Sequence, residues 1–190
     1  MSEVTLAVHA HFTFAEYLEL EQRSQTKHEF LDGVVFAMAG GTPEHAAIAA
    51  RLARLIGNAL EGRPCNVYTS DLRIRVPLTG LTTYPDLSVI CDRLETDPED
   101  PNTATNPILL VEVLSASTAA YDRGEKLAHY QRLPSLCEVL FVAHDGEQLE
   151  LWQRQGQGGW LLRVARGAES LELESVSVQV RVSDVYRGAF

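Results

Sequence analysis

The chain has 190 residues, of which 45% are hydrophobic and 22% are charged, as is usual for one globular domain with its own core. Its formal net charge of −10 argues against a broad basic surface for nucleic acid. The charge does not exclude a nuclease with a compact site, because bound divalent cations supply local positive charge. Its apolar runs are far shorter than the ~20 residues of a membrane-spanning helix, and its first residues are not typical of a signal peptide.

The first part of the chain predicts a short helix followed by a hairpin. Thr13 and Glu16 have the spacing of a capping box, which begins the helix. Two apolar segments over 27–37 are separated by Asp32 and Gly33, a pair typical of a tight hairpin turn.

A second helix is predicted over 43–62. Thr42 is a preferred N-cap residue, and Pro43 suits the first helical position. Apolar residues then recur at helical spacing, namely Ile48, Leu52, Leu55, Ile56 and Ala59.

Three strands are predicted in the middle of the chain, over 71–76, 87–91 and 108–114. The first alternates, with Leu72, Ile74 and Val76 facing inward. The other two are short apolar runs, which are typical of strands covered on both faces. The segment from Asp92 to Pro107 is expected to be a polar loop.

The rest of the chain predicts a helix over 119–132, a strand over 137–143 and a C-terminal antiparallel strand region. This order favours an α/β (α+β) fold in which a mixed β-sheet is flanked by helices, within a single domain over residues 1–190.

The three cysteines, Cys65, Cys91 and Cys137, are far apart, and none of their spacings suits a zinc site or a redox pair. Each lies in or beside an apolar stretch. We therefore expect three reduced core residues in a cytoplasmic protein.

Charged residues stand where the strand pattern expects none. Asp86 begins the 87–91 strand, and Glu112 lies inside the 108–114 strand, where an unpaired carboxylate would be strongly destabilising. Lys126, on the helix that follows, is one of two lysines among 16 basic residues. A compact point charge suits catalysis at a phosphate better than the wide arginine fork does. Two acids and a lysine could together build a divalent-metal site for phosphodiester cleavage.

These residues resemble the signature of the PD-(D/E)XK nuclease superfamily, carried here by Pro85-Asp86, Glu112-Val113-Leu114 and Lys126. More closely, the chain is similar to a large bacterial family of restriction-endonuclease-like proteins labelled as a domain of unknown function. The matching segments are 28–33, 84–89, 111–115 and 121–127 with Tyr130. Leu114 stands where the superfamily pattern has a lysine, and in the resembled family that lysine lies on the following helix, which gives Lys126.

The resemblance implies a restriction-endonuclease-like core and a metal-dependent endonuclease that hydrolyses phosphodiester bonds in DNA. It makes Asp86, Glu112 and Lys126 catalytic. It implies that Mg²⁺ (or Mn²⁺) is held by Glu29, Asp86, Glu112 and the backbone carbonyl of Val113. We further expect a cytoplasmic homodimer with DNA as its substrate, no organic cofactor and no membrane partner.

Simpler roles stay open for these residues. Asp86 could cap a turn after its proline, and Glu112 could form a buried ion pair with an arginine. Lys126 could be the exposed partner of Asp122 at the i, i+4 spacing. Glu29 could be a solvated strand residue.

His45 is expected to pack or cap in the first turn of its helix. Asp71 and Arg73 share the outward face of their strand, where they could line a cleft or simply be solvated. Tyr130 is expected in the core or at an interface.

The alternative function is a non-catalytic homodimeric binding module that retains a vestigial nuclease fold. The acidic net charge supports it. So does the strand-rich C-terminal region, whose edges could pair across a two-fold axis.

Overall fold

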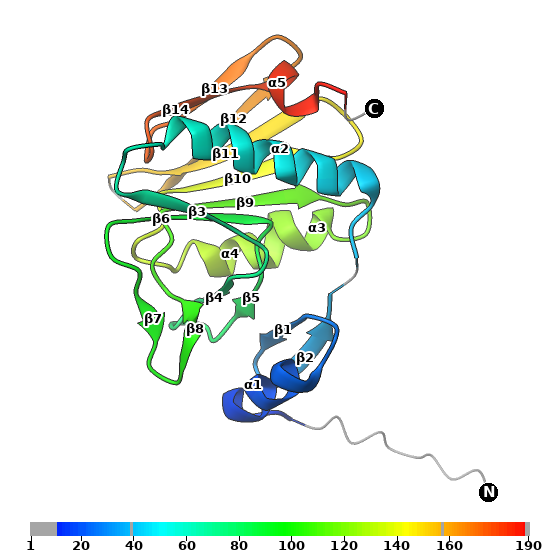
Figure 1. Ribbon diagram of the computed structural model, residues 1–190, viewed down its shortest axis with the longest axis vertical. Coiled ribbons are helices and arrows are strands. Elements are labelled where there is room, and N and C mark those ends of the chain that lie inside the picture. Colours follow the sequence, from blue (N-terminus) through cyan, green and yellow to red (C-terminus); the bar gives the residue numbers. More distant parts are fainter. Residues whose placement is uncertain (1–10, 39, 157, 189–190) are drawn as a thin grey trace, which may run out of the picture.

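The structure is a computed structural model that describes residues 11–38, 40–156 and 158–188 (Figure 1). The described elements follow in chain order: α1 (Phe14–Arg23), β1 (His28–Leu31), β2 (Val34–Ala37), α2 (Pro43–Ala59), β3 (Cys65–Thr69), β4 (Arg73–Arg75), β5 (Thr82–Thr83), β6 (Leu87–Cys91), β7 (Thr96–Asp97), β8 (Asp100–Ala104), β9 (Leu109–Leu114), α3 (Ala119–Tyr121), a π-helical turn η1 (Asp122–Lys126), α4 (Leu127–Tyr130), β10 (Glu138–Ala143), β11 (Gln148–Arg154), β12 (Trp160–Arg166), β13 (Ser170–Leu173), β14 (Val178–Arg181) and α5 (Val182–Tyr186).

The central sheet has the strand order β12-β11-β10-β9-β6-β3. Strands β9 and β10 are parallel, and their neighbours are antiparallel. Helix α2 and the hairpin β13–β14 cover one face, and the helical segment α3–η1–α4 covers the other (Figure 1). The predicted mixed sheet flanked by helices is therefore confirmed. All six residues of β9 and of β10 are buried, as expected for strands covered on both faces.

The predicted elements of the N-terminal part are confirmed. Both hydrogen bonds of the capping box between Thr13 and Glu16 are present. Asp32 and Gly33 have φ values of 54° and 81°, which place both residues of the hairpin turn in the left-handed region that a tight primed turn requires. Thr42 caps α2 through its side chain.

A second sheet, in the order β2-β1-β5-β4-β8-β7, corrects the prediction of a loop from Asp92 to Pro107. Strands β7 and β8 lie in that segment. Two of its polar residues leave the solvent, because Asp100 and Thr103 are buried against Arg73 of β4. Arg73 is thus half-buried rather than part of a solvated face.

The strand predicted over 71–76 is also shorter than expected. It is reduced to β4, and Leu72 is only half-buried, whereas Ile74 and Val76 face inward as predicted. Asp71 lies outside β4, with its side chain exposed and paired to Lys27.

The prediction of three reduced core cysteines is wrong. Cys65 of β3 lies directly opposite Cys91 of β6 in an antiparallel pair, and the two form a disulfide. Cys137 is exposed and, within the described residues, is the free cysteine. The pairing of β3 with β6 brings together two thiols that are 26 residues apart in the sequence.

The helix predicted over 119–132 runs to Tyr130 and contains a π-helical turn in its middle. None of the helices in the described ranges is both long and apolar enough to cross a membrane.

Candidate active site

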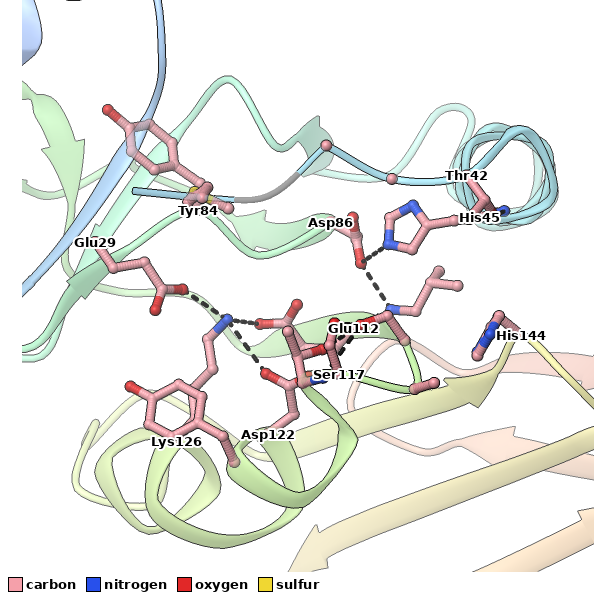
Figure 2. A pocket seen from close by; sticks show the side chains of 18 of the residues that line it. Glu29, Thr42, His45, Tyr84, Asp86, Glu112, Ser117, Asp122, Lys126 and His144 are labelled. Carbon is pink, nitrogen blue, oxygen red and sulfur yellow. Dashed lines mark hydrogen bonds and ion pairs between the residues drawn. The ribbon is translucent and has the colours of Figure 1, made fainter. Parts of the chain in front are cut away.

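The pairing of β6 with β9 brings Asp86 and Glu112 together. Leu87 is opposite Val111 in this antiparallel pair, so the next position places Asp86 beside Glu112. Opposite residues of neighbouring strands point to the same face of a sheet. Asp86 Oδ2 also accepts a hydrogen bond of 2.7 Å from the backbone N–H of Val113. The two acids therefore face one cavity, as Figure 2 shows.

Lys126 lies among the carboxylates. Its Nζ is 3.0 Å from Glu112 Oε1, 2.9 Å from Glu29 Oε1 and 3.6 Å from Asp122 Oδ1 (Figure 2). Only 6% of its side chain is exposed. The helix-borne lysine approaches Glu112, and it also pairs with Asp122 at the i, i+4 spacing, but this pair is buried rather than exposed.

The π-helical turn η1 orients this cation. It begins at Asp122 and ends at Lys126, both of which are buried and face the site. Single π-helical turns inside α-helices occur frequently at functional sites. Tyr130, which was expected in the core or at an interface, is buried, and so is Leu127. Glu125, the residue before Lys126, is exposed, because adjacent positions along a helix point in different directions.

Glu112 is a buried carboxyl with two donors. Tyr130 donates its hydroxyl to Glu112 Oε1 at 2.5 Å, and Lys126 contacts the same oxygen. Burial raises the pKa of Glu112 to about 7, against the lowering effect of Lys126, and the charges of Asp86 and Asp122 add to the rise. For Lys126, burial opposes the charged form, but Glu112 and the other carboxylates hold its pKa well above the ordinary value.

Glu29 reaches the site from the N-terminal hairpin. Its Oε1 accepts a hydrogen bond from the Thr83 hydroxyl at 2.5 Å and also contacts Lys126. Its side chain is 13% exposed, so it is not the solvated strand residue that was left open. Glu29 and Glu112 thus hold the lysine from two sides.

His45 contributes more than the first-turn packing that was expected of it. Its Nε2 is 3.2 Å from Asp86 Oδ2, and this hydrogen bond raises the pKa of His45 although burial opposes the rise. Its backbone N–H donates to the hydroxyl of Thr42, the N-cap of α2. A Cβ at position 41 would lie 2.7 Å from the imidazole of His45, so the glycine at this position avoids a steric clash with the ring. Nothing in the local sequence shows that α2 begins beside Asp86.

These groups line a cavity of about 500 Å³ between the N-terminal hairpin, the start of α2 and the central sheet. Among the described residues that line it are four carboxylates and a single lysine, with no arginine. The lining comprises Glu29, Phe36, Ala37, Met38, Gly40, Gly41, Thr42, His45, Tyr84, Asp86, Glu112, Val113, Ser115, Ala116, Ser117, Thr118, Tyr121, Asp122, Lys126 and His144.

The donor set of the cavity suits a hard divalent cation. Carboxylate and carbonyl oxygens are the ligands that Mg²⁺ prefers, and Asp86, Glu112 and Val113 supply both kinds at one place. Across the described ranges, however, no three His, Cys, Asp or Glu side chains gather as a metal-binding group. The residues present therefore fit a cation that keeps several waters rather than one enclosed by side chains.

Comparisons with known proteins identify the family of the chain. A family model described as "Uma2: Putative restriction endonuclease" matches residues 14–183. "Uncharacterized protein slr1290" of Synechocystis sp. is 40% identical over 91% of this chain and 90% of its own length. "Uncharacterized protein sll1609" of the same organism is 32% identical over 85% of this chain and 91% of its own.

The fold has a solved counterpart. The crystal structure of "a putative nuclease belonging to DUF820" from Anabaena variabilis superposes with a TM-score of 0.77. It covers 94% of this chain and 99% of its own, at 16% sequence identity. The predicted restriction-endonuclease-like fold is confirmed.

Proposed function

We propose that this chain, which belongs to the Uma2 family of restriction-endonuclease-like proteins, is a metal-dependent endonuclease that hydrolyses phosphodiester bonds in DNA. The observation that carries the proposal is the meeting of Asp86, Glu112 and Lys126 in one cavity, with the lysine 3.0 Å from Glu112. Three segments that are distant in the sequence supply the two acids and the cation that such a reaction needs.

Asp86, Glu112 and the carbonyl of Val113 would hold Mg²⁺ or Mn²⁺. When bound, the cation supplies positive charge that neutralises the developing charge on the phosphate. The cavity lining carries four carboxylates and one lysine, and this excess of acidic groups favours a bound cation. Glu29 contacts Lys126, so its first role is to orient the lysine, and its part as a metal ligand stays a prediction.

The side chains of the chain itself would position and stabilise the substrate. Lys126 would donate hydrogen bonds to the phosphate oxygens as they gain charge, a type of stabilisation often worth 10²–10³-fold in rate. Tyr130 would hold Glu112 in a single orientation through its hydroxyl. His45 would do the same for Asp86.

The proposal also includes the substrate, the assembly and the cellular location of the protein. DNA is the proposed substrate, and a homodimer is the proposed assembly. A cytoplasmic location is kept as a proposal, although the disulfide between Cys65 and Cys91 counts against it, because disulfides are rare in the cytosol.

A cleavage assay tests the proposed function. Purified protein should nick or cut DNA with Mg²⁺ or Mn²⁺ and should not do so with a chelator. Glu112→Gln keeps the volume of the side chain but removes the charge that a cation needs, so it should lower the rate by at least about 100-fold. Equal cleavage by wild type and Glu112→Gln would contradict the proposal.

One observation favours the second candidate, a binding module with a vestigial site. Lys126 is already neutralised by carboxylates, so the site can persist as a buried ion-pair cluster without any metal. A magnesium titration followed by thermal unfolding separates the two candidates. A functional site gains stability with metal, by RT ln(1 + [L]/Kd), and a vestigial one does not.

A further inference from the structure

One wall of the cavity is apolar and has no part in the proposed metal chemistry. Val34 and Phe36 of β2 are 44% and 49% exposed, and Met38, which follows β2, is half-buried. Alternate residues of a strand share a face, so these three side chains form one stripe. Phe36 and Met38 belong to the lining of the cavity. We call Val34, Phe36 and Met38 the apolar stripe.

The register of the hairpin turns the apolar stripe toward the site. Phe36 is directly opposite Glu29 in the β1–β2 pair, so the two side chains lie on the same face. Glu29 in turn contacts Lys126. The other face of the hairpin carries Phe30 and Val35, which pack into the N-terminal core. An exposed aromatic ring therefore stands beside the acids and the lysine.

The charge of the molecule limits how a nucleic acid can be held. Most non-specific affinity for duplex DNA comes from lysine and arginine contacts to phosphates. Here the net charge is −10, and the described part of the cavity lining offers one lysine. Stacking of bases on aromatic rings supplies affinity that does not depend on a basic surface.

The space is sufficient for such a contact. A volume of about 500 Å³ lies within the range of about 300–1,000 Å³ that is typical of small-molecule pockets. A base that is still paired and stacked in a duplex cannot present its flat face to a side chain unless it is first extruded.

On the premise of the proposed function, we propose that the apolar stripe stacks an unpaired nucleobase next to the scissile phosphate. Phe36 provides the stacking surface, and Val34 and Met38 flank it. The substrate class is thus single-stranded nucleic acid, or a single-stranded end or gap, rather than continuous duplex.

The test is a binding measurement that does not require cleavage. A short single-stranded oligonucleotide that contains 2-aminopurine is titrated with wild type, Phe36→Ala and Phe36→Trp, with a chelator present. Stacking should quench the fluorescence of the probe with wild type and with Phe36→Trp. With Phe36→Ala the quench should disappear, and binding should weaken by about tenfold or more.

Leu78→Ala is the matched control, because Leu78 is an apolar side chain that is 74% exposed and lies outside the cavity lining. It should bind like wild type. Phe36 is an exposed side chain, so its replacement should leave thermal unfolding nearly unchanged, and size-exclusion chromatography should show the same oligomeric state for all variants.

The outcomes separate this inference from the proposed function. Phe36-dependent binding of the single strand without any cleavage would support the inference and count against the nuclease. Cleavage that favours duplex, or that is the same in Phe36→Ala, would support the nuclease and overturn the inference. A change of oligomeric state in Phe36→Ala, with binding unaltered, would assign the stripe to a protein contact and also overturn it.

Discussion

At the scale of single residues, Glu112 links the stability of the protein to its proposed function. It is a carboxyl that is 7% exposed, and it shares its partner Lys126 with two other acids. A carboxyl with a raised pKa prefers to be protonated in the folded state, and a bound cation reverses this preference. The same residue can therefore report the presence of metal through stability alone.

We predict that the metal-free protein loses stability as the pH rises from about 4.5 to 7. Between the ordinary pKa of 4.5 in the unfolded chain and the folded value of about 7, the folded state binds more protons than the unfolded state. The stabilisation that protonated Glu112 gives to the folded state is complete below the unfolded pKa of 4.5 and is lost as the pH rises past the folded pKa of about 7. The difference should be on the order of 3 kcal/mol.

Urea unfolding at several pH values, in the presence of a chelator, measures this dependence. The Glu112→Gln variant should show a flatter profile, which separates Glu112 from His45, whose pKa is also raised. Magnesium should restore the stability of wild type at pH 7 and above. A wild-type profile that rises over the same range would show that Glu112 is ionised and paired throughout.

The residues that the sequence singles out are those that break a local pattern. Asp86 and Glu112 interrupt apolar strands, and Lys126 is unusual in an arginine-rich chain. The structure brings these three together. His45 and Tyr130 break no pattern, because a histidine in a first turn and a tyrosine on a buried helix face are common. Their contacts with Asp86 and Glu112 depend on how distant strands pair.

At the scale of elements, the hairpin and the π-helical turn position the two partners of the cluster. The hairpin carries Glu29, and η1 carries Lys126. Each of the two elements contains a glycine: Gly33 lies in the turn of the hairpin, and Gly124 lies in η1.

We predict opposite effects of alanine at two glycines. Gly33→Ala should destabilise the protein by about 1–2 kcal/mol, because Gly33 has a φ of 81° that L-residues rarely adopt. Gly124→Ala should stabilise it by about 0.5–1 kcal/mol, because Gly124 lies in the helical segment and a Cβ there meets no atom within 4 Å. Chemical denaturation of the two variants checks both signs. Stabilisation by Gly33→Ala would contradict the primed turn.

Elements with a strong local signal are predictable, and those built from polar residues are not. The capping box, the Asp32-Gly33 turn and the apolar runs predict α1, the hairpin, β6 and β9. Strands β7 and β8 have no apolar alternation. They form because Asp100 and Thr103 find Arg73 on a neighbouring strand, a partner that lies about 30 residues earlier.

At the scale of the whole molecule, the central sheet connects segments that are distant in the sequence. Strand β6, which follows Asp86, lies between β9, which carries Glu112, and β3, to which the disulfide joins it. The position of Asp86 therefore depends on pairing along the entire sheet.

We predict that breaking the Cys65–Cys91 disulfide lowers the free energy of unfolding by about 3 kcal/mol, because the bond closes a long loop in the unfolded chain. Cys65→Ser or reduction should have this effect, as measured by guanidinium unfolding. Cys137→Ser, which replaces the exposed cysteine, is the control and should change stability little. A count of three free thiols, measured in denaturant on protein that was never exposed to a reductant, would show that the bond does not form.

The disulfide also shows a limit of prediction from the sequence. The spacing of Cys65 and Cys91 carries no motif, and the bond follows from the antiparallel register that places them opposite one another. The parallel pairing of β9 with β10 is fixed in the same non-local way. Apolar patterns indicate which segments become strands, but not the order in which the strands lie.

The most direct test of the account is metal-dependent DNA cleavage by Lys126→Ala, compared with Lys27→Ala. Lys27 is the other lysine of the chain, and it pairs with an exposed aspartate outside the cavity. Lys126→Ala should lower the cleavage rate by at least about 100-fold, Lys126→Arg should also be poor, and Lys27→Ala should cleave like wild type.

Because Lys126 is buried among carboxylates, its loss also affects folding. The comparison is therefore made on protein that circular dichroism shows to be folded, with Mg²⁺ present. A magnesium-induced rise in Tm should survive in Lys126→Ala, because the cation is held by the acids. Loss of cleavage in folded, metal-binding Lys126→Ala is the result that the account predicts, and unchanged cleavage would contradict it.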